Sequence, residues 1–438
     1  MSKFLKNNFI FYIILFLSTA LLQLKFYNFN NNHFDTGIEI HDTYRVFSGD
    51  INHLFSGHIK LIKIFFLPVF YFDNILIISF FFFFIKTACV LSPLYFFKKI
   101  KIKILYIINP ITWNFLLGDF VYDYLLIPLF FFTFHHSKKN INYQFLSLSF
   151  LFIKETFFIF PFILGLINYF RLKDKKWIFL TLLALILKIL FFNKIYLEGK
   201  SGGVMSFLPN TTIASHVDYS ILIFFILLAV NYIIIFPNFK NRFSIVCSVI
   251  LLIIYLFFSF YNQRLSIFSH YHLPFFLILF TFYCKKKINY FFKYKIATLI
   301  LFNFLFSISF ISLSFWKTDP VKTYSRISYI KNFNQERIHY INFREKKIAI
   351  SNSFLLPETI LSKKLISFAP DINLYDLDYV IISKKYISYG DKICFKKEEC
   401  SFLMDYEKAI SNMLQSFIKI KEYRNYTIYQ KKLDYKVH

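Results

Sequence analysis

Glycine and proline are scarce in this sequence, where they supply 9 and 11 of the 438 residues. Phenylalanine, isoleucine, lysine and asparagine are abundant instead, which indicates a biased, AT-rich genome. The five cysteines include no CxxC pair and no Cys/His cluster with zinc spacing, so no zinc site is predicted. The sequence also shows neither a repeat of roughly 20–50 residues nor the inverted pair of broken helices found in many transporters.

Acidic residues are few: the sequence has 25 Asp and Glu but 51 Lys and Arg, so the formal net charge is +26. In a soluble protein this excess would indicate a nucleic-acid partner. Membrane proteins, however, collect Lys and Arg in their cytoplasmic loops, and the biased composition raises the lysine count further. Nucleic acid is therefore not predicted as a partner.

Long apolar runs dominate the chain, which is 57% hydrophobic. A helix crosses a bilayer with about 20 mostly apolar residues. The sequence predicts an α-helical polytopic membrane protein with about eleven transmembrane helices. The predicted spans are Asn8–Leu24, Asn74–Phe97, Ile102–Leu117, Phe120–Phe134, Ile141–Ile153, Thr156–Phe170, Trp177–Tyr196, Tyr219–Phe236, Phe243–Tyr261, Tyr271–Cys284 and Ile296–Trp316.

Loop charge gives the orientation. With Lys3 and Lys6 in the cytoplasm, every second loop is rich in lysine or arginine, as the positive-inside rule requires. The N-terminus is then cytoplasmic, and residues 25–73 form the first outer loop of a membrane domain covering 1–317. Residues 318–438 form an extracytoplasmic domain. Bacterial cytoplasmic (inner) membrane is the predicted location, with membrane lipids as partners.

Three alternatives affect this topology. Ile141–Phe170 is either two short helices separated by Lys154-Glu155 or one long span, which would invert every later loop. Ile59–Phe72 is too short to span and is interpreted as an interfacial or re-entrant helix. Ser18-Thr19-Ala20 also resembles a signal-peptide cleavage site, although an uncleaved first span suits a chain with many more spans.

The C-terminal 318–438 segment has mixed charge and predicts a small α/β domain. Ile348–Ser351 and Tyr379–Ser383 are predicted to be strands, Pro357–Ser362 a short helix, Asp405–Phe417 a helix and Ile418–Gln430 a hairpin. Cys394 and Cys400 lie in this domain. An extracytoplasmic compartment permits a disulfide between them, and two unpaired thiols are the alternative.

Ionisable residues gather in the predicted outer loops, where they are candidates for function. Asp35, Glu39 and Asp42 follow i, i+4, i+7 spacing, which places three carboxylates on one helix face. This face is either catalytic or metal-binding, or it is the solvated polar face of an interfacial helix.

Other candidates also have two interpretations. Lys154-Glu155 is either part of a site or an ion pair that caps a helical hairpin. Asp123 is either a site residue or a carboxylate that complements a helix dipole. Arg264, His270 and His272 either hold a lipid phosphate or anchor the chain at the interface.

The residues resemble a known family in order along the chain. Phe34-Asp35-Thr36-Gly37-Ile38 is similar to the F-D-x-G-I signature of the DUF2079 membrane proteins, and Lys154-Glu155 to their K-E pair. Further resemblances, spread from Phe34 to Ser383, are His58 with Pro68, Asn109-Pro110, Phe120-x-x-Asp123 with Pro128, His270-Tyr271-His272-Leu273-Pro274, Asn352 with Pro357, Leu361-Ser362 with Pro370, and Asp378-Tyr379-Val380. Departures occur as well: Val121 and Tyr122 stand where the family usually has His and Pro.

This resemblance implies the GT-C-like superfamily, whose enzymes transfer a sugar from a polyprenyl-phosphate donor on the outer face of the membrane. It places the acid of the first outer loop at Asp35. The predicted catalytic residues are Asp35, Asp42 and Glu155. The predicted substrate-binding residues are Glu39, His58, Asp123, Lys154, Arg264, His270 and His272.

Clustered carboxylates suit Mg²⁺ or Mn²⁺, and Asp35 and Asp42 are the candidate ligands. The expected partner is a polyprenyl-phosphate-linked sugar. The residues leave open whether the chain is an active enzyme. The alternative is a lipid-linked glycan transporter or a non-catalytic membrane protein of cell-envelope assembly.

Overall fold

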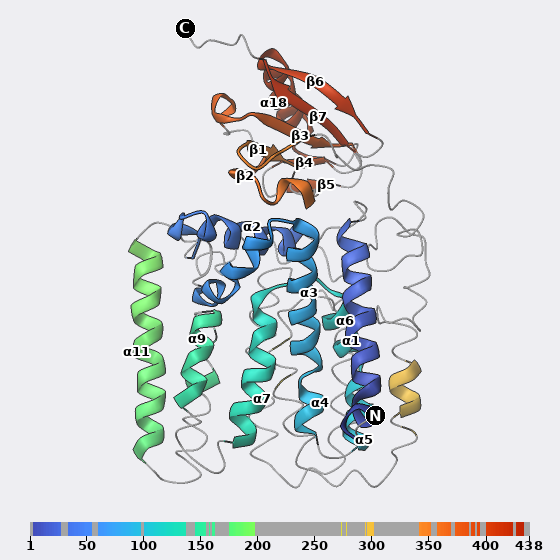
Figure 1. The fold of residues 1–438 in the computed structure, drawn as a ribbon. Coiled ribbons are helices and arrows are strands. Elements are labelled where there is room, and N and C mark those ends of the chain that lie inside the picture. Colours follow the sequence, from blue (N-terminus) through green and yellow to red (C-terminus); the bar gives the residue numbers. More distant parts are fainter. Residues whose placement is uncertain are drawn as a thin grey trace. The chain divides into compact units, whose positions relative to one another are not determined.

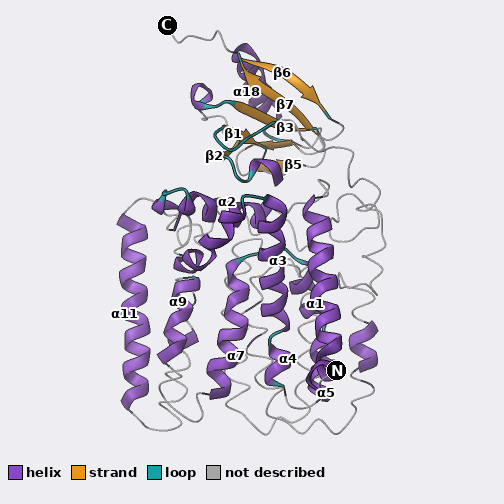
Figure 2. Ribbon diagram, viewed as in Figure 1, coloured by secondary structure: helices purple, strands orange, loops and turns teal. Residues whose placement is uncertain are grey.

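The computed structural model is mostly helical and has a small sheet domain at the C-terminus (Figure 1, Figure 2). It describes residues 3–27, 34–54, 60–97, 100–136, 145–154, 157, 160–162, 175–197, 273, 277, 294, 296–301, 341–351, 357–368, 373–384, 387–389, 392–394, 400–423 and 426–432. The predicted spans between Tyr219 and Trp316 lie almost wholly outside these residues.

The chain divides into two compact units. The first comprises Met1–Thr19, Ile51–Phe66 and Phe84–Phe315. The second comprises Ala20–Asp50, Leu67–Phe83 and Trp316–His438. The first outer loop predicted from the sequence is thus split, and the helix that carries its acidic residues belongs to the same unit as the C-terminal domain.

The helices of residues 3–197 follow the predicted apolar runs with shifted ends. They are α1 (Lys3–Tyr27), α2 (Phe34–Phe47), η1 (Ile51–Leu54), η2 (Leu61–Phe72), α3 (Ile75–Leu91), α4 (Pro93–Phe96), α5 (Ile100–Ile107), α6 (Pro110–Leu117), η3 (Tyr122–Leu125), α7 (Leu126–His136), η4 (Leu146–Ser149), α9 (Phe150–Ile153) and α11 (Lys175–Leu197), where η marks a 3₁₀-helix.

One helix among the described residues, Ile75–Phe96, is long and apolar enough to cross a membrane. It combines α3 and α4 and matches the predicted span Asn74–Phe97. The buried core helix of a soluble protein has the same character, so this helix alone does not establish a membrane protein. Eleven spans are not confirmed. In the part of the chain that the structure describes, four further apolar helices are shorter than a span: Phe11–Leu24, Leu61–Phe72, Tyr122–Thr133 and Ile178–Leu187.

The predicted span Ile102–Leu117 is bent. α5 and α6 meet at an angle of 63° on either side of a short break. Pro110 starts α6, and a proline disfavours helical backbone at the residue before it. Asn109 stabilises the new start because its side-chain oxygen accepts a hydrogen bond from the backbone N–H of Ile111, over 2.9 Å.

The interpretation of Lys154-Glu155 as an interruption agrees with the end of α9. This helix stops at Ile153, and Lys154 is extended with φ −163° and ψ 133°. The helix is therefore not continuous at Lys154, and the choice between two short spans and one interrupted span stays a prediction.

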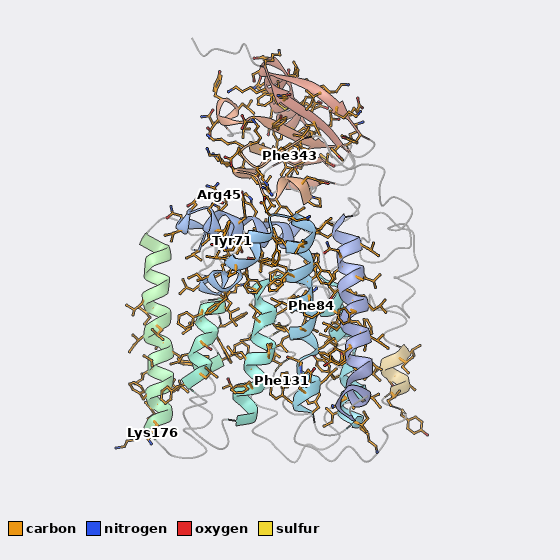
Figure 3. All side chains as sticks on the ribbon, viewed as in Figure 1. Arg45, Tyr71, Phe84, Phe131, Lys176 and Phe343 are labelled. Carbon is orange, nitrogen blue, oxygen red and sulfur yellow. The ribbon has the colours of Figure 1, made fainter. Side chains whose placement is uncertain are left out.

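Aromatic rings fill the interior of the first unit. Phe131 of α7 is buried and lies 5.6 Å from the ring of Phe97 and 6.3 Å from that of Phe96, between ring centroids (Figure 3). Edge-to-face and offset pairs of this kind favour packing beyond the apolar area that they bury. The Tyr106 hydroxyl nearby donates to the carbonyl of Val90, so this buried phenol is satisfied.

The C-terminal domain contains a five-stranded sheet in the order β2-β1-β3-β7-β6. The parallel strands are β1 (Lys347–Ile350), β2 (Lys364–Ser367) and β3 (Tyr379–Ser383), and an antiparallel hairpin of β6 (Phe417–Glu422) and β7 (Tyr426–Lys431) extends the sheet from β3. β4 (Ile387–Tyr389) and β5 (Lys392–Cys394) form a separate two-stranded sheet. Short 3₁₀ turns η8 (Pro357–Thr359) and η9 (Leu374–Asp376) complete the domain.

Alternation along the strands gives the five-stranded sheet two apolar faces. One face carries Ile348, Ile350 and Ile381, packed with Phe343 and Ile428. The other face carries Ala349, Val380 and Ile382. Neighbouring side chains of a strand point to opposite faces, so consecutive apolar residues in β1 and β3 fill both cores.

The helix α18 (Leu403–Ser416) covers the second face. Tyr406, Ala409, Ile410 and Met413 pack into its core and repeat at i, i+3, i+4, i+7, the spacing of an amphipathic helix. The predictions of β1, β3, this helix and the terminal hairpin are confirmed with small shifts at their ends, whereas β2, β4 and β5 were not predicted from the sequence.

Candidate functional site

Three lysines are buried among the residues that the structure describes: Lys63, Lys86 and Lys154. Each belongs to the first compact unit. A buried ammonium loses its hydration, so it persists only where carboxylates or carbonyls replace the lost water. The partners of these lysines therefore mark the polar interior of the unit.

Lys154 pairs with Asp123 across 31 residues of sequence. Its Nζ lies 3.2 Å from Asp123 Oδ2, and the two side chains are 8% and 6% exposed. Asp123 stands in the first turn of η3, and Lys154 follows the last residue of α9. The alternative interpretation of Lys154 expected an ion pair with Glu155, whose structure lies outside the described residues. Within the described residues, Asp123 is a carboxylate partner of Lys154.

Lys86 caps the end of α6. Its Nζ donates to the carbonyl of Leu116 over 3.2 Å and to that of Gly118. Carbonyls at a helix C-terminus carry partial negative charge, which favours a cation there. The same Nζ lies 5.2 Å from the ring centroid of Tyr124, within the range of a cation–π contact.

These contacts converge on the segment Gly118–Tyr124. We call this segment, together with Lys86 and Lys154, the charged turn. Tyr124, under Lys86, is the residue after Asp123, the partner of Lys154. The turn also contains Asp119, so Lys86, Lys154, Asp119 and Asp123 sum to a formal charge of zero. The two buried ammonium groups beside this turn are nevertheless the kind of donor that binds an anionic group such as a phosphate.

Lys86 and Lys63 were missed in the sequence, although a signal was present. Lys86 interrupts the apolar run Ile75–Leu91, and an ionisable residue inside such a run is by default a candidate for function. Lys63 lies in η2 and donates to the backbone carbonyl of His53 over 2.9 Å.

The predicted acidic face lies on α2, in the second unit. Glu39 is buried at 4% exposure, and Asp42 is half-buried. The alternative of a solvated polar face is therefore wrong for Glu39. Asp35 belongs to α2 by its backbone, but its side chain is outside the described part of the chain.

α2 ends in a well-defined cap. The N–H of Asp50 donates to the carbonyl of Arg45 over 2.9 Å, and that of Gly49 to Val46 over 3.0 Å. This double pattern is a Schellman motif, in which Gly49 adopts the left-handed φ of +96° that glycine tolerates. Arg45 also pairs with the carboxylate of Asp50 at 3.0 Å.

Several predicted site residues lie outside what the structure describes. These are His58, Glu155, Arg264, His270 and His272. Of the predicted set, the described residues bring Asp123 and Lys154 into contact. Asp123 and the acidic residues of α2 belong to different units, so their convergence stays a prediction.

The metal and disulfide predictions have different outcomes. Among the described residues, no group of three or more His, Cys, Asp or Glu is arranged to hold a metal ion, and the side chain of Asp35 is not among them. Cys400 is disulfide-bonded. Its predicted partner Cys394 has a described backbone in β5 but no described side chain, so this pairing stays a prediction.

The surface of the C-terminal domain also carries exposed ion pairs. Lys384 and Lys419 lower the pKa of the Glu422 carboxyl to about 2, chiefly through their hydrogen bonds to it. Lys347 and Lys364 lower the pKa of Asp376 in the same way. Exposed pairs of this kind contribute little to stability and do not indicate a site.

Comparison of the chain with protein-family models, with curated proteins and with solved structures finds no match. The charged turn and α2 are therefore interpreted from their own chemistry.

Proposed function

We propose that the chain is an integral membrane glycosyltransferase of the GT-C type. It transfers a sugar from a polyprenyl-phosphate donor to an acceptor on the outer face of the bacterial cytoplasmic membrane. The observation that carries the proposal is the charged turn, where Lys86 and Lys154 are buried beside Asp123. Buried cations stabilise the negative charge that develops on a leaving phosphate.

The proposed reaction needs two kinds of group. A carboxylate accepts the proton of the attacking acceptor hydroxyl, and cations hold the phosphate that leaves the sugar. Asp35 is the proposed base, supported by Asp42, and Lys86 and Lys154 are the proposed phosphate ligands. Glu39 and Asp42 offer the oxygen atoms that Mg²⁺ or Mn²⁺ prefers, but no step of the proposed reaction depends on a metal.

The test uses the full-length protein in lipid nanodiscs with a radiolabelled polyprenyl-phosphate sugar. We expect Asp35→Asn to abolish sugar transfer while it elutes and melts like the wild type. Lys86→Met should also abolish transfer while it elutes as a folded protein, with a lower melting temperature because two buried carbonyls lose their donor. Lys101→Met is the matched control, because Lys101 is an exposed lysine of α5 in the same unit. Normal transfer by both site variants would end the assignment.

The second candidate is a lipid-linked glycan transporter or a non-catalytic protein of cell-envelope assembly. It is favoured by the mutual neutralisation of Asp123 and Lys154, which lets the pair hold the charged turn without any substrate. Transbilayer movement of a fluorescent lipid-linked glycan, in the absence of sugar transfer, would establish it.

The proposed orientation has its own test. A phosphatase fused after residue 438 should be active, whereas a fluorescent protein that folds only in the cytosol should stay dark. The opposite result would place the C-terminal domain in the cytoplasm and remove the proposed reaction from the outer face.

A further inference from the structure

The C-terminal domain and the first outer loop are joined by hydrogen bonds within the second compact unit. His41 Nδ1 lies 2.7 Å from the carbonyl oxygen of Ile360, and Arg45 Nη1 donates to the carbonyl of Lys363. Arg344, just before β1, donates from Nη1 to the Asp73 carboxylate. The contacts join residues 271 to 319 positions apart in the sequence, so only tertiary structure makes them.

The geometry of α2 separates these contacts from Glu39. His41 and Arg45 are four residues apart and share one face of the helix. At 100° per residue, Glu39 projects about 160° from His41 and about 120° from Arg45. The face that contacts the domain is thus separate from Glu39, whereas Asp42, three residues before Arg45, lies only about 60° from Arg45, so Arg45 borders the acidic face.

A third face of α2 packs on η2. The ring of Phe47 stacks on Phe70 at 5.8 Å and meets Tyr71 edge-on at 5.1 Å, between centroids. Tyr44 lies 5.8 Å from Phe70 as well. Rings on one face and hydrogen bonds on another restrict rotation of the helix about its own axis.

The Arg344 contact fixes the other end of η2. Asp73 links η2 to α3 with φ +54°, a left-handed conformation that few residues other than glycine adopt. Arg344 Nη2 also donates to the Asp73 carbonyl over 2.6 Å. One guanidinium thus binds both the side chain and the backbone of this turn, a forked geometry that lysine cannot reproduce.

The acceptors of the α2 contacts are backbone carbonyls. A carbonyl oxygen only accepts, so Nδ1 of His41 carries the proton in this hydrogen bond. A substitution at Ile360 or Lys363 leaves the acceptor in place. The contact is therefore tested through its donors.

We propose that His41, Arg45 and Arg344 are positioning residues through which the C-terminal domain fixes the orientation of α2. The consequence for catalysis rests on the proposed function: the domain sets the direction in which the carboxylates of α2 face the acceptor. The domain would then act on the reaction without contacting the substrate.

The experiment uses the full-length protein in nanodiscs and measures amide hydrogen exchange in peptides from α2. Loss of the buried His41 hydrogen bond should raise the exchange rate by about tenfold in His41→Leu, and loss of the exposed Arg344–Asp73 contact should raise it by a smaller factor in Arg344→Gln. His41→Asn should stay close to the wild type, because its amide replaces the Nδ1 donor. Lys384→Gln is the control, since it removes a cation of the same domain that pairs with Glu422 instead.

Sugar transfer is measured on the same samples. We expect the kcat of His41→Leu to fall about tenfold and that of Arg344→Gln to fall by a smaller factor, each with an unchanged KM for the donor, because the donor site remains intact. Arg344→Lys should recover part of the kcat. Exchange in α2 that is unchanged in both donor-deleting variants would overturn the positioning role. Faster exchange in a protein whose wild type transfers no sugar would support the positioning of α2 and refute the glycosyltransferase assignment alone.

Discussion

Removal of one charge from the Asp123–Lys154 pair should destabilise the protein strongly. The pair joins η3 to the end of α9 with an N–O distance of 3.2 Å and side chains that are 6% and 8% exposed. At an effective dielectric constant of about 20, this separation corresponds to an attraction of about 5 kcal/mol. Most of this attraction offsets the lost hydration of the two groups, so the net value of the pair is small.

Removing one partner of the ion pair should change the free energy of unfolding more than removing both, and this difference can be measured. Asp123→Asn leaves a buried ammonium without its carboxylate, and Lys154→Met leaves a buried carboxylate without its ammonium. Each should lower the free energy of unfolding by about 3–5 kcal/mol, the usual effect of breaking a buried pair. The double variant should be less destabilised than the sum of the two, because neither charge then remains.

Unfolding of the purified full-length protein in mixed micelles, with increasing SDS, measures this cycle. Lys101→Met provides the control, because an exposed lysine should change the free energy by no more than about 0.5 kcal/mol. Strictly additive single effects, or losses below about 1 kcal/mol in both, would refute the reasoning. The two groups would then not depend on each other for their burial.

Two further predictions concern the C-terminal domain. Met413→Ala, at a fully buried position of α18, should lower the free energy of unfolding by about 2–5 kcal/mol. Met404→Ala, at a position of the same helix that is 85% exposed, should leave it almost unchanged, and chemical unfolding of both variants checks this. Asp376 has a lowered pKa because it accepts hydrogen bonds from Lys347 and Lys364, so its stabilising effect is present above about pH 4 and is lost as the pH falls through the folded-state pKa. Hydrogen exchange in β1 between pH 6 and pH 3 should therefore show a smaller acid effect in Asp376→Asn than in the wild type, and equal curves would contradict this account.

The fold was partly predictable, because several elements are encoded by adjacent residues. The apolar run at Ile75–Phe96 predicts a long helix by its composition alone. Tyr406, Ala409 and Met413 give α18 its helical period. β2 escaped prediction because its four residues form a strand through their pairing with β1 rather than by their own pattern.

The candidate site was less predictable. The sequence marks Lys154 and Asp123 as charges near apolar helices, because an ionisable residue in that setting is costly, and both are buried in the structure. It did not reveal that they are partners, because they are 31 positions apart and the residues between them do not show how the helices pack. Lys86 was overlooked for a related reason: the carbonyls that satisfy it come from α6, and only the packing of α3 near the end of that helix makes its burial acceptable.

The sequence by itself determined the apolar helical character of the first part of the chain, the small α/β domain at its end and the spacing of the carboxylates on α2. Local composition and periodicity suffice for these features, because each depends on residues a few positions apart. Only the tertiary structure decided that Asp123 pairs with Lys154 and that Lys86 caps α6. It also decided that the C-terminal domain binds α2 through a hydrogen bond to His41. Hydrogen bonds and ion pairs act over about 3 Å, so they depend on where folding brings distant residues and not on their separation along the chain.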